Sequence, residues 1–298
     1  MVFHVRHSRW ILHQAPERRK NAVCATPEAG RKPTIHLEDA IVESQEEYRG
    51  GYRVLRLLSP RIGPEVQPGQ FVHLKVPQLR EALLRRPFSV YKADKRTVTL
   101  LYKDIGQGTH GMTRLSPGDG VSLIGPLGRP FPCHADGSYP VLVAGGYGMA
   151  ALYLVARNQT VPGIAFFGGA TEQDILCVDE FENMGWRVVV TTVDGSLGTR
   201  GMVTDALDPW LAGGKGDRKP EFFSCGPNAM LKAVASRSLV NGWKAWVSMD
   251  RNMGCGVGAC LTCVQKVRAA NEPGWTWARV CKEGPVFDAG DVLWDGVD

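Results

Sequence analysis

Three cysteines and three glycines stand close together in one stretch near the C-terminus, MGCGVGACLTC. Four residues separate Cys255 from Cys260, two separate Cys260 from Cys263, and Cys281 follows later in the chain. Three thiolates from one loop and a fourth from a later segment are typical of plant-type [2Fe–2S] ligation. Glycines let such a loop curl, so that its N–H groups can point at negatively charged sulfur. We therefore predict an iron–sulfur cluster on these four cysteines.

A structural zinc ion is the main alternative for the same cysteines. Zinc sites usually take their ligands as two pairs, with two to four residues between the members of a pair. Cys281 stands alone, which does not suit that pattern. A set of buried free thiols explains the spacing least well. Both alternatives stay open here, but a [2Fe–2S] cluster carries single electrons and would need a second redox group to exchange them with.

Two motifs in the first half of the chain have residue types that suit a flavin. In RRPFSV, Arg86 can bind a pyrophosphate, Phe88 can stack on a planar ring, and Ser89 can hydrogen-bond its edge. In YKDIGQGTHG, Gly108 and Thr109 belong to a turn whose backbone N–H groups can face a phosphate. Each motif taken alone also fits an ordinary strand or turn.

Two further motifs follow apolar runs in the second half. VLVAGGYGMA has closely spaced glycines, Gly145, Gly146 and Gly148, where the backbone can approach a dinucleotide, although the full G-x-G-x-x-G pattern is not present. SCGPNAM has Cys225 at the end of another apolar run, directly before a predicted helix start at Asn228. A buried small hydrophobic residue is the alternative interpretation of Cys225.

These motifs lie in regions of different character. From Ile35 to about Pro132, short β-rich runs alternate with Pro-Gly and Gly-Asp turns, which predicts an antiparallel barrel or sandwich. From about Tyr139, four strand–helix repeats predict a parallel doubly wound sheet, whose ligands bind at the carboxyl ends of the strands. After Lys244 the chain becomes rich in Cys, Gly and Trp. This piece is too small to fold alone without a stabilising element such as a metal centre or disulfides.

We therefore expect a multidomain β plus α/β protein. Its predicted parts are a basic flexible extension (1–33), an antiparallel β-barrel that binds FAD (34–135), a parallel doubly wound α/β domain that binds NAD (136–244), and a small [2Fe–2S] domain (245–298).

The charge distribution argues against nucleic-acid binding. The chain has a formal net charge of +5, and residues 1–33 hold seven Lys/Arg against two Asp/Glu, so the remaining 28 basic and 28 acidic residues balance. No basic stripe with interleaved aromatic residues appears after Lys32. Arg6, Arg9 and His13 interrupt the apolar run that a secretory signal would need. The segment faintly resembles an organellar transit peptide, but a flexible extension or an upstream misassigned start codon fits it better.

One uncharged run, Gly137 to Ala156, has about the 20-residue length of a membrane span. Pro140 and the three glycines of the first nucleotide motif interrupt it, which favours a buried strand, a tight turn and a helix start. Of eight cysteines in the chain, four lie in the cluster motif. A secreted disulfide scaffold would be shorter and denser in cysteine, so we expect a soluble protein of the reducing cytoplasm.

Taken in order, the motifs resemble the ferredoxin–NADP reductase superfamily. More narrowly, they resemble the iron–sulfur electron-transfer subunits of dihydroorotate dehydrogenase B. The resemblance runs from about Ile35 to Asp298. It rests on RPFS (86–89), GT (108–109), GPLG (125–128), DGSLGTRGMVTD (194–205), CGPNAMLKAV (225–234), MGCGVGAC (253–260) and RVCKEGPVF (279–287).

The resemblance implies FAD, NAD as a substrate and a [2Fe–2S] cluster, with no acid–base catalytic residue. FAD would contact Arg86, Pro87, Phe88, Ser89, Leu101, Tyr102, Lys103, Gly108 and Thr109. NAD would lie near Gly145, Gly146, Gly148, Cys225, Gly226 and Pro227, and the cluster would bind Cys255, Cys260, Cys263 and Cys281. Departures from the family pattern are Tyr147, Ala151, the SMD sequence at 248–250, and a long aromatic insert before Cys281.

The resemblance also implies a partner, an FMN-containing catalytic subunit that oxidises dihydroorotate in a heterotetramer with two copies of each chain. Electrons would pass from its FMN through the cluster and FAD to NAD⁺. Glu172, after the second strand of the α/β part, would repel a 2′-phosphate and favours NAD over NADP.

Three alternatives stay open. The same module could serve another partner, as in a sulfide dehydrogenase or an electron-bifurcating ferredoxin–NADP reductase. It could be a stand-alone reductase that feeds an oxygenase. Outside redox chemistry, it could be a zinc-stapled nucleotide sensor.

Overall fold

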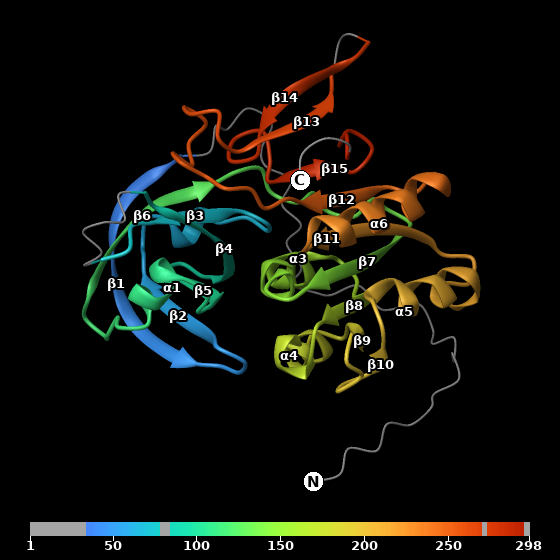
Figure 1. Cartoon of the computed structure of the whole chain (residues 1–298), viewed down its shortest axis with the longest axis horizontal. Coiled ribbons are helices and arrows are strands. Elements are labelled where there is room, and N and C mark those ends of the chain that lie inside the picture. The colour runs from blue at the N-terminus through green and yellow to red at the C-terminus, as the bar shows by residue number, and fades with distance from the viewer. Residues whose placement is uncertain (1–33, 78–83, 270–272, 295–298) are drawn as a thin grey trace.

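A computed structural model describes residues 34–77, 84–269 and 273–294 of the chain (Figure 1). The basic extension expected at 1–33 lies outside the described residues. Within those ranges, no helix is both long enough and apolar enough to cross a membrane. The run that imitates a span instead forms a strand, a turn and two short helices, as the sequence predicts.

The first region is a closed antiparallel barrel with strand order β1-β2-β5-β4-β3-β6, which confirms the barrel prediction. Alternate residues point inward, so that side chains such as Leu55 and Leu57, or Val72 and Leu74, fill its core. Its elements are β1 (His36–Glu47), β2 (Tyr52–Leu58), η1 (Gly63–Glu65), β3 (Phe71–Leu74), β4 (Arg86–Ala93), β5 (Thr97–Lys103), α1 (Gln107–Met112) and β6 (Gly120–Leu127). The sequence does not mark β1 as a strand, because only Ala40 and Val42 of its 12 residues join the buried apolar core.

The second region is a seven-stranded sheet, ordered β10-β9-β8-β7-β11-β12-β15. All neighbouring strands are parallel except β12 and β15, and the predicted doubly wound sheet is confirmed. The elements before β12 are β7 (Ser138–Gly145), α2 (Gly148–Ala151), α3 (Tyr153–Asn158), β8 (Ile164–Gly169), η2 (Glu172–Asp174), α4 (Val178–Asn183), β9 (Arg187–Thr192), β10 (Thr199–Arg200), α5 (Val203–Pro209), η3 (Trp210–Gly214), β11 (Lys219–Cys225) and α6 (Asn228–Val240).

The last segment is built into this sheet. Strand β12 (Ala245–Ser248) pairs with β11, and β15 (Val286–Asp288) pairs with β12 at the sheet edge. Between them, β13 (Val264–Arg268) and β14 (Trp275–Arg279) form a separate two-stranded hairpin that projects from the molecule (Figure 1). Cys263 and Cys281 belong to the same buried core as Phe222 of the sheet. This shared core stabilises the small segment, which is too short to form a sufficient core of its own. The domain limits expected from the sequence stay predictions.

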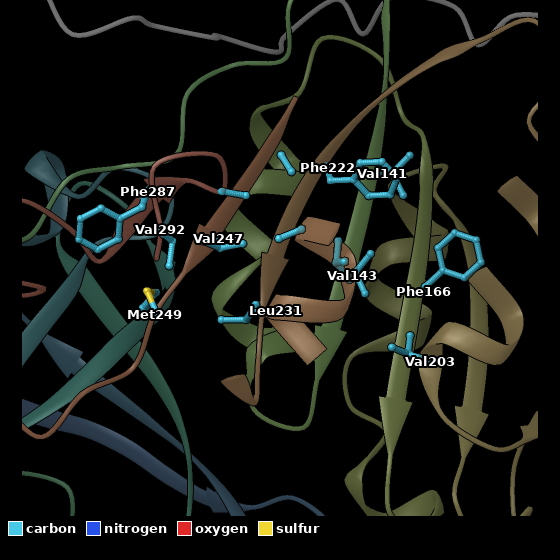
Figure 2. Packing of buried hydrophobic residues seen from close by; sticks show 14 of the residues in the cluster. Val141, Val143, Phe166, Val203, Phe222, Leu231, Val247, Met249, Phe287 and Val292 are labelled. Carbon is cyan, nitrogen blue, oxygen red and sulfur yellow. The ribbon is translucent and has the colours of Figure 1, made fainter. Parts of the chain in front are cut away.

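Phe222 lies near the centre of the packing between the sheet and α6. Its ring is fully buried, and Figure 2 shows it beside Val141 of β7, with Leu231 of α6 on the same side of the sheet. Trp243 packs on it with ring centroids 6.2 Å apart. This side chain belongs to the core that the nucleotide region shares with the cysteine segment.

We expect Phe222→Ala to lower the free energy of unfolding by about 3–5 kcal/mol, because it opens a cavity in this joint core. Urea unfolding followed by tryptophan fluorescence measures the change. Val240→Ala is the control, because Val240 is 87% exposed and its loss should change stability by less than about 0.5 kcal/mol. Equal effects of the two variants would contradict the assignment of Phe222 to the core.

Candidate functional site

A pocket lies where the barrel, the carboxyl ends of the sheet strands and the cysteine segment meet. The barrel contributes Phe71, Pro87, Phe88, Ser89, Leu101, Tyr102, Lys103, Ile105 and Thr109. The sheet and the loops that follow its strands contribute Tyr147, Ala150, Cys225, Gly226, Ser248, Met249 and Asp250. Met253 and Pro285 of the cysteine segment complete the lining. Three regions of the chain thus share one mostly apolar pocket, the usual character of a cofactor site.

Most of the residues predicted to bind FAD lie on this lining, and the other two lie beside each other. A side chain on Gly108 would come within 3.3 Å of Arg86 Nε, so the arginine lies directly against the glycine-rich turn. The Arg86 guanidinium donates to the Leu84 backbone oxygen at 2.8 Å and has further N–H groups for an anion. The fold therefore brings the two predicted flavin motifs together, and their role in binding FAD stays a prediction.

Thr109 already uses two N–H groups of the glycine-rich turn. Its Oγ1 accepts hydrogen bonds from the backbone of Ile105 at 3.0 Å and of Gly106 at 3.1 Å. These contacts fix the start of α1, as the N3 side chain of a capping box does when it reaches back to the N-cap backbone. Any phosphate at this turn would therefore depend on N–H groups other than those of Ile105 and Gly106.

Lys103 faces the sheet. Its Nζ lies 2.8 Å from Asp174 Oδ1, and Tyr52 donates to the same carboxylate oxygen at 3.1 Å. Both partners of Asp174 come from the barrel, whereas Asp174 belongs to η2 at the end of β8. The lysine side chain thus links the barrel to the sheet at the edge of the pocket.

The residues predicted to bind NAD gather at the ends of β7 and β11. A Cβ on Gly148 would lie 2.1 Å from the Cys225 backbone oxygen, and one on Gly226 would lie 2.9 Å from the Gly145 nitrogen. No side chain fits at either place, so the two strand ends touch through backbone. Burial raises the pKa of Cys225 to about 12, so its thiol is neutral at pH 7. It is small and uncharged at the pocket surface, and its role in NAD binding stays a prediction.

Tyr147 spans the pocket from the glycine turn to the start of the cysteine segment. Its hydroxyl donates to Asp250 Oδ2 at 3.1 Å, and the residue is 47% exposed. Burial of the hydroxyl, followed by the charge of Asp250, raises the pKa of Tyr147, so the phenol keeps its proton. These two positions are among the departures from the family pattern, and the fold places them in direct contact.

The cysteine loop points backbone N–H groups at sulfur. Cys255 Sγ accepts from the backbone of Ala259 at 3.2 Å and of Cys260 at 3.3 Å, and Cys260 Sγ accepts from the Thr262 hydroxyl at 3.3 Å. That hydroxyl contributes most to lowering the pKa of Cys260 to about 6. These donors suit negatively charged thiolate ligands.

The glycines of the loop have different roles. Gly256 has φ +71° and Gly258 has φ +82°, and in both cases a Cβ would also collide with a neighbouring side chain. Gly254 has no positive φ, but a Cβ there would come within 3.2 Å of Cys260 Sγ. The glycines at 256 and 258 therefore shape the loop, and the one at 254 leaves room for a sulfur.

The four cysteines are arranged as two pairs. Cys255 and Cys260 are joined by the N–H to sulfur contacts of the loop, and the Cys281 N–H donates to Cys263 Sγ at 3.4 Å. Among the described residues, no group of three or more His, Cys, Asp or Glu side chains is arranged to hold one metal ion. A zinc site needs four ligands on one ion, whereas a [2Fe–2S] cluster takes two on each iron. The two pairs suit the two irons of such a cluster, and the assignment of its ligands stays a prediction.

Several site residues were missed by the sequence reading. Phe71 of the pocket and His73 beside the cysteine loop lie in the run PGQFVHLKV, which the sequence predicts only as a strand, and Met253 and Pro285 lie in the quoted motifs without a predicted role. The alternation of β3 could have placed Phe71 and His73 on one face. No local signal could have shown that this face meets the cysteine segment.

Comparisons with known proteins identify relatives of this chain. Residues 250–293 match the model of the iron–sulfur cluster binding domain of dihydroorotate dehydrogenase B. The electron transfer subunit of dihydroorotate dehydrogenase B (NAD⁺) from Bacillus mycoides is 36% identical over 266 residues, which cover 87% of this chain and 99% of that relative. The corresponding subunit from Bacillus cereus strain Q1 is 35% identical with the same coverage.

Two solved structures are also similar to this chain. A chain of an NADH-dependent reduced ferredoxin–NADP oxidoreductase aligns with TM-score 0.74 and 28% identity, over 86% of this chain and 90% of that one. The Amycolatopsis cytochrome P450 reductase aligns with TM-score 0.58 and 26% identity, over 71% of this chain and 68% of that one. With two relatives matched over nearly their whole length, this chain belongs to the family of dihydroorotate dehydrogenase B electron-transfer subunits.

Proposed function

We propose that this chain passes electrons between NAD and a catalytic subunit that oxidises dihydroorotate to orotate with FMN. The observation that carries the proposal is the shared pocket, in which residues of the predicted flavin, nucleotide and cluster segments all line one space. When bound, the flavin exchanges an electron pair with NAD and single electrons with the cluster. The subunit names of the relatives support a partner chain, and we propose two copies of each chain in the complex.

The residues of this chain position and shield the bound groups. Phe88 and Ser89 of β4 offer a planar side chain and a hydroxyl to the flavin ring, and Arg86 offers a charge to its phosphates. The neutral Cys225 and Gly226 line the pocket at the end of β11, where a nicotinamide would lie. Met249, Met253 and Pro285 make the cluster side of the pocket apolar, which excludes water from the route between flavin and cluster.

The nucleotide is proposed to be NAD. Glu172 lies in η2 at the carboxyl end of β8, where a carboxylate would repel a 2′-phosphate. Its backbone N–H donates to Ser196 Oγ at 2.8 Å, which ties the residue to the loop after β9.

Co-purification with the untagged catalytic subunit of the same organism tests the proposal. The complex should reduce NAD⁺ when given dihydroorotate, and the isolated chain should contain FAD and about two irons for each polypeptide. A colourless protein that contains zinc and no iron would support the zinc-stapled sensor instead.

One observation favours a second partner. The structural match to the ferredoxin–NADP oxidoreductase chain covers most of both molecules. If the purified chain has both cofactors but does not support dihydroorotate oxidation in the complex, reduced ferredoxin is the donor to test next.

Cys260→Ser should abolish electron transfer to the catalytic subunit while retaining most of the NADH-dependent reduction of a two-electron dye. The reason is that dye reduction needs only the flavin, whereas transfer to the partner needs the cluster. Steady-state assays with each acceptor measure the two rates. Asn252→Ser, which introduces the same residue at an exposed position before the loop, should keep both. An equal loss of both rates in Cys260→Ser would refute the sequential route.

Arg86→Ala should weaken FAD binding by about 10- to 100-fold, because it removes a charge-assisted contact to phosphate. Fluorescence titration of FAD into the flavin-free protein measures the dissociation constant. Arg96→Ala is the matched control, since Arg96 is exposed in the turn between β4 and β5. Unchanged affinity in Arg86→Ala would remove this arginine from the flavin site.

A further inference from the structure

His73 is a buried polar side chain that the electron-transfer route described above does not use. It is 0% exposed, and within the described structure neither Nδ1 nor Nε2 makes a hydrogen bond of ordinary geometry. An imidazole carries at least one N–H in every protonation state. Leaving such a donor unsatisfied in a protein interior costs about 1–3 kcal/mol. The backbone groups of Cys255 and Arg85 lie near the ring, but neither meets it with ordinary hydrogen-bond geometry, so a ring N–H is still without a well-placed acceptor.

The ring lies directly against the cysteine loop. A Cβ on Gly256 would come within 2.4 Å of His73 Nδ1, so only glycine fits above the imidazole. Gly256 follows Cys255, whose sulfur receives two backbone N–H groups of the loop. The acceptors that a cluster would add at this place are sulfur atoms with negative charge.

The strand that carries His73 also reaches the flavin pocket. Val72 and Leu74 point into the barrel core, whereas Phe71 lines the pocket and packs in the core that contains Cys263 and Cys281. Phe71 and His73 are two residues apart, so they lie on the same outward face of β3. Figure 1 shows the chain of the cysteine segment above β3 and β6 of the barrel. One short strand therefore borders both proposed redox sites.

We propose that His73 is a positioning residue whose ring N–H donates a hydrogen bond to a cluster sulfur on the Cys255 side, a bridging sulfide or the thiolate itself. The inference rests on the proposed cluster ligands. A donor at sulfur stabilises the reduced cluster, because reduction adds negative charge there. His73 thus favours acceptance of an electron by the cluster and fixes the barrel against the cluster loop.

The first test is the midpoint potential of the cluster in the full chain, measured by electron paramagnetic resonance during a redox titration. His73→Leu removes the donor and should make reduction about tenfold less favourable, a shift of about 59 mV to lower potential. His73→Gln keeps an N–H donor and should recover at least part of the shift. His36→Leu, a histidine replacement on β1, is the control and should leave the potential unchanged.

The second test begins with the unaltered protein. Protein labelled with ¹⁵N-histidine and then reduced should show a hyperfine coupling between the cluster and a histidine nitrogen in pulsed electron paramagnetic resonance. The same coupling should be lost in His73→Gln. No histidine coupling in the wild type, or an unchanged potential in a cluster-loaded His73→Leu, would overturn this inference while leaving the proposed function intact. Wild-type protein with no iron and no signal would overturn the proposed function as well.

Discussion

The antiparallel pairing of β15 with β12 is the interaction on which the placement of the three sites depends. β12 ends at Ser248 and β15 begins at Val286, and all four cysteines of the motif lie in the chain between them. The Met249 N–H donates to the Pro285 oxygen at 2.9 Å, which joins the two ends of the segment that carries the cysteines. Because β12 also extends the nucleotide sheet, the cysteine loop is held at the carboxyl ends of its strands.

The pairing of β15 with β12 also brings the cysteine segment against the barrel. Pro285 forms a bridge with Arg129, just after β6, and Gly256 lies on the ring of His73 in β3. On the opposite side, Lys103 and Tyr52 hold the barrel to η2 through Asp174. The pocket is therefore bounded by contacts at both ends, and a cofactor within it would meet backbone and side chains whose positions are fixed by the packing.

Much of the fold could be read from local patterns. The alternation in TVTLLYK and the turn residues around it predict β5, and the apolar runs before glycines predict β7 and β8. β12 was not predicted, because AWVS is short and adjoins a segment dominated by cysteine and glycine. The helix expected after the glycine turn is interrupted at Leu152, giving two short helices. These differences arise where tertiary contacts, not periodicity, decide where an element begins and ends.

By itself, the sequence determined the set of candidate ligands and motifs, because cysteine spacing, glycine turns and strand alternation are properties of neighbouring residues. Only the tertiary structure decided that the cysteines form two pairs, that Lys103 binds Asp174 across a domain boundary, and that His73 lies buried against the cysteine loop. Each of these contacts joins segments far apart in the chain, except the pair within the loop. Such contacts depend on how whole sheets pack together, and no local pattern encodes that packing.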